Sequence, residues 1–133
     1  MKSYSLKQDI LLLIARLVLG GAMFYGHGIG KIERVFGPRP VKFGDPLGIG
    51  AELSLYLVAF AEGICAALLM LGLFTRLATI PLIIAMGVVV FVVKWKNGFG
   101  DMELPLVYLV GFLSILVFGP GRFSIDQLRR KAW

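Results

Sequence analysis

The sequence predicts an all-α membrane protein, a bundle of four transmembrane helices followed by a short interfacial helix at the C-terminal end. The first reason is composition: the 133 residues are 58% hydrophobic and 17% charged, whereas soluble domains are about 45–50% apolar and about 25% charged. The second is a mean hydropathy of +0.84. The third is that the apolar residues gather in four runs, close to the roughly 17–25 residues that span the hydrocarbon. These features exclude an ordinary soluble enzyme.

The four runs predict the spans of a single domain that covers residues 1–133. Apolar and polar residues do not alternate within them as they do in a barrel strand, and a helix satisfies every backbone polar group inside the bilayer. Lysines precede the first run, as in a signal peptide, but Arg16 interrupts it and no small-residue cleavage site follows, which favours a retained helix. The predicted spans cover about residues 10–28, 53–74, 77–94 and 103–118.

The connections between the spans differ in length. Residues 31–52 form a long loop that is rich in glycine, proline and charge. Thr75 and Arg76 are the whole link between the second and third spans, which predicts a tight antiparallel hairpin. Four spans place both termini on one side of the membrane. Slightly more basic residues flank that side than the other, so the positive-inside rule favours cytoplasmic termini.

The C-terminal tail predicts a short helix at the membrane surface. Gly119, Pro120 and Gly121 end the fourth span, because proline does not continue a helix. Ser124, with Gln127 three residues later, has the spacing of a capping box. The basic residues after it would hold the new helix against anionic lipid.

Two charged residues lie well inside the predicted spans, away from the span ends, where a charge costs several kcal/mol. Arg16 is in the first span, and Glu62 is near the middle of the second. At about 1.5 Å per helical residue their depths differ by less than about 8 Å, a gap that an arginine side chain bridges. One interpretation is therefore a buried Arg16–Glu62 pair that only locks two helices together. The other is a functional polar site.

His27 extends the polar face of the first span. It follows Arg16 by about three helical turns, which places the two residues about 20° apart on one face, with Lys31 near them. Such a face points inward or into a water-filled cavity, so we expect a polar pocket open on the side away from the termini. The alternative is that these residues are interfacial anchors. Histidine transfers protons near neutral pH, but a single histidine without neighbouring ligands makes a poor metal site, and we expect no metal.

The small residues and the single cysteine have structural interpretations. Ala22, Gly26 and Gly30 are spaced four apart, a pattern that lets membrane helices approach closely. Cys65 is the only cysteine, so no disulfide forms within the chain, and its apolar surroundings favour a small buried side chain. The net charge of +6 comes from basic residues that flank apolar runs, so we expect no nucleic-acid binding.

Several further motifs are spread along nearly the whole chain. They are Arg16 with Gly20, the sequence His27-Gly28-x-x-Lys31, Glu62, the run from Leu71 to Arg76, Glu103, and the sequence from Gly119 to Asp126. In their order and spacing they resemble the DoxX family of small four-helix membrane proteins. The resemblance implies an inner-membrane protein of a bacterium or an archaeon. It also implies a candidate ligand-binding set, without assigned catalytic roles: Arg16, His27, Lys31, Glu62, Arg76 and Glu103.

Two classes of function fit these features. The resemblance favours a redox-associated subunit that binds a quinone or a similar small molecule in the polar pocket, because members of the family are associated with quinone-linked oxidoreductases. The chain has no evident flavin, haem or iron–sulfur motif, so a partner oxidoreductase would supply the electrons. The alternative is a small dimeric transporter that uses Glu62 for proton coupling. A membrane-protein assembly factor is a third interpretation.

Overall fold

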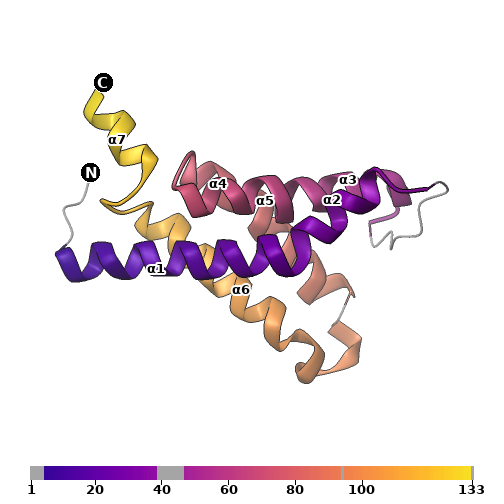
Figure 1. The fold of residues 1–133 in the computed structure, drawn as a ribbon. Coiled ribbons are helices and arrows are strands. Elements are labelled where there is room, and N and C mark those ends of the chain that lie inside the picture. Colours follow the sequence, from indigo (N-terminus) through magenta and orange to yellow (C-terminus); the bar gives the residue numbers. More distant parts are fainter. Residues whose placement is uncertain (1–4, 39–46, 94, 133) are drawn as a thin grey trace.

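The computed structural model describes residues 5–38, 47–93 and 95–132, and the regular elements within them are all helices. Four helical segments are long and apolar enough to cross a membrane, and the short helix α7 (Ile125–Ala132) follows them. The predicted all-α fold with four membrane spans is thereby confirmed (Figure 1). The four segments cover Leu6–Val35, Ala51–Leu71, Thr75–Val93 and Phe99–Phe118.

The first segment is a continuous helix in three parts. These parts are α1 (Leu6–Met23), the π-helical turn η1 (Phe24–Gly28) and α2 (Ile29–Val35). Ser5 caps its start, since the Ser5 hydroxyl accepts from the Gln8 amide at 3.3 Å and the Gln8 side chain accepts from the Ser5 amide at 2.9 Å. The helix continues into the start of the predicted loop 31–52, which places Lys31 on α2.

The second segment is built in the same way. It consists of α3 (Ala51–Ala59), the π-helical turn η2 (Phe60–Cys65) and α4 (Ala66–Leu71). The segment ends at Gly72, whose φ of 70° suits glycine. A Cβ at this position would lie 2.4 Å from the Arg16 guanidinium, so glycine is also needed for space.

The link between the second and third segments differs from the predicted one. Thr75 and Arg76 are the first two residues of α5 (Thr75–Val88), and the turn is formed by residues 72–74 instead. The prediction was wrong because it took the end of the apolar run as the end of the helix, whereas polar side chains are common in a first helical turn. After α5 come the π-helical turn η3 (Val89–Val93), the 3₁₀ turn η4 (Trp95–Asn97) and α6 (Phe99–Phe118).

The helices are packed most closely at the end that carries both termini (Figure 1). There α1 packs against α4, and α5 packs against α6. At the middle of the bundle η1 contacts η2. Beyond this level the two pairs of helices diverge, because α2 packs on α3 whereas η3 and η4 pack on α6.

The apolar core occupies the closely packed end. All four segments contribute to it, and Met23, Leu69, Leu82 and Phe112 are each at most 1% exposed. Many large apolar side chains on the outer helix faces are exposed in the isolated chain, as expected of surfaces that contact lipid. The fold therefore has a tight apolar half near the termini and a more open half away from them.

Candidate functional site

Arg16 is buried at the closely packed end and does not pair with Glu62. The residue is 0% exposed, and its guanidinium donates to the carbonyls of Leu69 (3.4 Å), Met70 (3.2 Å) and Phe123. Two of these carbonyls belong to the last turn of α4, where helical hydrogen bonding runs out and the helix dipole is negative. The predicted Arg16–Glu62 pair is therefore wrong, because the end of α4 binds the arginine instead.

Because Arg16 and Glu62 have different partners, the effect of exchanging their charges by mutation can be predicted. Each single change, Arg16→Glu or Glu62→Arg, is expected to cost about 3 kcal/mol or more, because it disrupts a buried charged group. The double variant is expected to be no more stable than the less stable single variant, since the two side chains have different partners. Thermal unfolding in detergent, followed by circular dichroism, measures all three. Recovery of stability in the double variant would contradict the assignment.

Other polar residues at this end also hold helix termini. The Asp126 carboxylate accepts from the amides of Phe74 (2.7 Å) and Thr75 (2.8 Å), and so caps the N-terminus of α5 from a distant part of the chain. Arg76 donates to two carbonyls in the last turn of α6, at 3.1 and 3.4 Å. Arg16 and Arg76 therefore both stabilise the ends of helices in this structure.

A second charged group lies at the middle of the bundle, between η2 and α2. The Lys31 ammonium donates to the Glu62 carboxylate. The Glu62 side chain is 5% exposed, and that of Lys31 is 20% exposed. An ion pair in such surroundings is well shielded from water, and removal of one partner leaves an uncompensated buried charge. The sequence identifies both residues, but only the structure identifies them as partners.

Two glycines bring the first and second segments close enough for this pair to form. Gly28 in η1 faces the backbone of η2, where an added Cβ would lie 2.2 Å from the Glu62 carbonyl oxygen. Gly63 faces Ile32, and a Cβ there would lie 2.5 Å from the Ile32 Cδ1 atom. π-Helical turns are rare and frequently occur at functional sites. The direct contact of two such turns around Glu62 therefore marks this level of the bundle as a candidate functional site.

The predicted stripe of small residues is not the one that packs. A Cβ added to Gly26 or Gly30 would meet nothing within 4 Å, and Ala22 is exposed. The prediction was wrong because the spacing indicates only that the three residues share one face of the helix, and that face points away from the other segments. The four-residue spacing therefore falls on the outer face, and Gly28 makes the close contact instead.

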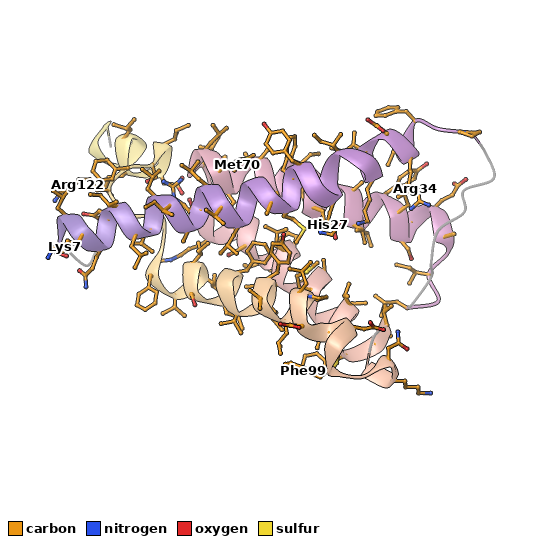
Figure 2. The ribbon with its side chains drawn as sticks, turned by 60° about the horizontal axis from the view of Figure 1, so that its bottom comes forward. Lys7, His27, Arg34, Met70, Phe99 and Arg122 are labelled. Carbon is orange, nitrogen blue, oxygen red and sulfur yellow. The ribbon has the colours of Figure 1, made fainter. Side chains whose placement is uncertain are left out.

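His27 and Tyr108 lie beside the charged pair, where the first segment meets α6. Their rings meet edge to face, with centroids 6.1 Å apart and planes at 89°, and Figure 2 shows His27 on the side of η1 that faces α6. Tyr108 is 7% exposed and stacks on Phe112 at 5.8 Å. We call Lys31, Glu62, His27 and Tyr108 the intramembrane polar group.

Tyr108 is not among the residues predicted for the site, although the sequence contains a signal for it. Tyr108 is the single phenol in the apolar run of the fourth span, and a buried tyrosine hydroxyl usually finds a polar partner. Glu103 was included in the candidate set, but it lies at the exposed surface near the start of α6. The fourth segment therefore contributes a tyrosine, rather than a carboxylate, to the buried group.

The intramembrane polar group offers complementary chemistry in a small space. Lys31 and Tyr108 provide hydrogen-bond donors, Glu62 provides an acceptor, and His27 provides one of each when neutral. Hydrogen bonds are stronger in surroundings of low dielectric than in water, so these side chains would orient a ligand that has carbonyl or hydroxyl oxygens. Carboxylate and imidazole side chains, such as those of Glu62 and His27, are also the types that most often act as general acids and bases.

Comparison with known proteins agrees with the membrane fold. The family model DoxX matches residues 11–95. An uncharacterized membrane protein of Mycobacterium tuberculosis is 31% identical over 114 residues, which cover 75% of this chain and 63% of the mycobacterial protein. An uncharacterized protein of Haemophilus influenzae is 27% identical over 139 residues, which cover 99% of this chain and 91% of the Haemophilus protein. No solved structure shows a significant match. The family match covers more than half of the chain, and the chain belongs to the DoxX family of membrane proteins.

Proposed function

We propose that this protein is a redox-associated subunit of the inner membrane, which binds a quinone or a similar small molecule at the intramembrane polar group. One observation supports the proposal most: Lys31 is paired with the buried Glu62, beside His27 and Tyr108, at the middle of a membrane-spanning bundle. Ionisable residues within the membrane are costly and generally mark a functional site. In this proposal the termini are cytoplasmic.

A quinone suits the chemistry of the group. Its two carbonyl oxygens accept hydrogen bonds, and Lys31 and Tyr108 have donors to offer. Its planar ring would lie against the aromatic side chains of His27 and Tyr108. Reduction of a quinone to a quinol adds two electrons and two protons, and Glu62 and His27 are suited to exchange the protons. A partner oxidoreductase would supply the electrons.

The alternative of a proton-coupled transporter depends on Glu62 as a carboxylate that exchanges a proton for a cationic substrate. Lys31 already neutralises this carboxylate. A substrate cation would have to displace the lysine, which would itself be left buried without a partner. The pair therefore favours a neutral ligand with carbonyl oxygens over an organic cation.

The proposal predicts that menadione, a quinone without a long side chain, stabilises the purified protein in lipid nanodiscs. A ligand at about 100 times its Kd raises the free energy of unfolding by about 2.7 kcal/mol, which thermal unfolding at increasing menadione concentrations detects. Tyr108→Phe removes one donor and keeps the ring, so we expect it to weaken binding about fivefold. Tyr25→Phe is the matched control, because Tyr25 is 71% exposed, and its affinity should be unchanged.

Two results would contradict the proposal. One is the absence of any stabilisation by menadione. The other is an equal affinity of the Tyr108→Phe and Tyr25→Phe variants. If tetraphenylphosphonium, a lipophilic cation, stabilises the protein instead, and Glu62→Gln abolishes that effect, the transporter becomes the better explanation.

A further inference from the structure

The apolar core separates the intramembrane polar group from the end of the protein that carries the termini. In each segment, buried apolar residues lie between the level of this group and the terminal end. They are Met23 in the first segment, Ala66 and Leu69 in the second, Ala78 and Leu82 in the third, and Phe112 and Ile115 in the fourth, each at most 3% exposed. A packed core has few voids as large as a water molecule. This layer therefore blocks a polar path from the terminal end.

A second layer closes the same end beyond the core. Residues 119–121 are buried although they belong to no helix, and a Cβ on Gly121 would lie 3.1 Å from Leu12 of α1. The backbone amide of Arg122 donates to the Asp9 carboxylate at 3.1 Å. The Arg16 guanidinium donates to the backbone carbonyl of Phe123, the residue after Arg122. The chain after α6 is thus hydrogen-bonded across the terminal ends of the helices.

The opposite side of the polar group is more open. There α2 packs on α3, η3 and η4 pack on α6, and the two pairs diverge (Figure 1). Lys31 is the member of the group that lies farthest from the termini along the first segment, and its side chain is 20% exposed. His27 is also partly exposed, whereas Arg16 on the terminal side is fully buried. Of these three polar residues of the first segment, Arg16 on the terminal side is therefore less exposed than His27 and Lys31.

We infer that the intramembrane polar group exchanges its ligand and its protons with only one face of the membrane, the face opposite the termini. The inference rests on the proposed function in taking this group as the binding site, but it does not depend on which molecule binds. If the termini are cytoplasmic, as proposed above, the ligand is a small molecule that arrives from the extracytoplasmic face. The protons exchanged with it then come from that face as well.

Thiol labelling from each face of the membrane tests this inference. Cys65→Ser provides the background, since Cys65 is the only native cysteine. His27→Cys reports the polar group, while Lys7→Cys and Asn97→Cys, both exposed, report the terminal face and the opposite face. An impermeant cationic methanethiosulfonate is applied to spheroplasts and to inverted vesicles. The two face reporters show which preparation presents which face.

We expect His27→Cys to react about tenfold faster, or more, in the preparation that labels Asn97→Cys than in the one that labels Lys7→Cys. Lys31→Cys is a second reporter in case His27→Cys does not reach the membrane. Equal rates from both faces, faster reaction from the terminal face, or no reaction of either reporter would overturn the inference. Labelling is measured without menadione, so failure of sided access is distinguishable from failure of quinone binding.

Discussion

Replacement of Lys31 by methionine is expected to lower the free energy of unfolding by about 3–5 kcal/mol, because it leaves a buried charge without a partner. The methionine keeps most of the apolar length of the side chain and removes the ammonium. The Glu62 carboxylate, whose side chain is 5% exposed, then has neither its counter-ion nor water. Unfolding of the purified protein by SDS in mixed micelles, followed by circular dichroism, measures the loss.

Two further variants separate the ion pair from other effects of the substitution. Lys96→Met makes the same chemical change at an exposed lysine, and its effect should stay within about 0.5 kcal/mol. Lys31→Met combined with Glu62→Gln removes both charges, so we expect it to recover about 2 kcal/mol relative to Lys31→Met alone. The pairing would be refuted if Lys31→Met were as stable as Lys96→Met, or if the losses of the two single changes simply added.

The second large effect is expected at Gly28, where alanine should lower the free energy of unfolding by about 3 kcal/mol. The added Cβ would lie 2.2 Å from the Glu62 carbonyl oxygen and 2.8 Å from the Gly63 Cα. Both are backbone atoms of a helix, so no side-chain rotation relieves the overlap. The helices must separate instead, which also moves Lys31 away from Glu62, and the same SDS titration measures the result.

Gly30→Ala is the matched control for this steric argument. Gly30 is also helical, but a Cβ added there would meet nothing within 4 Å. Alanine is a better helix former than glycine by about 1 kcal/mol, so Gly30→Ala should leave the protein as stable or slightly more stable. Gly28→Ala should therefore lower the free energy of unfolding, whereas Gly30→Ala should leave it unchanged or raise it slightly. Destabilisation of similar size at both positions would show that the close contact of η1 with η2 is not the cause.

The membrane fold follows from the sequence because hydrophobicity is a property of each stretch of the chain by itself. Four apolar runs and an even number of spans predict four helices with both termini at one end, and the structure has this arrangement. The helix ends are less predictable, because Lys31 and Thr75 lie on helices outside the apolar runs. A helix can extend by a turn of polar residues, and hydrophobicity along the sequence does not indicate such a turn.

The residues of the candidate site were predictable only in part. His27, Lys31 and Glu62 are conspicuous because they are polar residues in or next to apolar runs. Tyr108 is not, since its ring suits an apolar helix and only its hydroxyl marks it as polar. Its place in the site depends on the packing of α6 beside η1, which brings the Tyr108 and His27 rings to 6.1 Å.

The sequence by itself determined which segments enter the membrane and which polar residues enter with them. The tertiary structure decided which of those residues meet. A helical wheel assumes the same rotation at every residue, and the π-helical turn at residues 24–28 breaks that assumption. Arg16 binds carbonyls at the end of α4, and Glu62 binds Lys31, because the packing of the first two segments places these groups next to one another. Depth in the membrane is set locally by hydrophobicity, whereas the partner of a buried charge is set by the packing of helices that are distant in sequence.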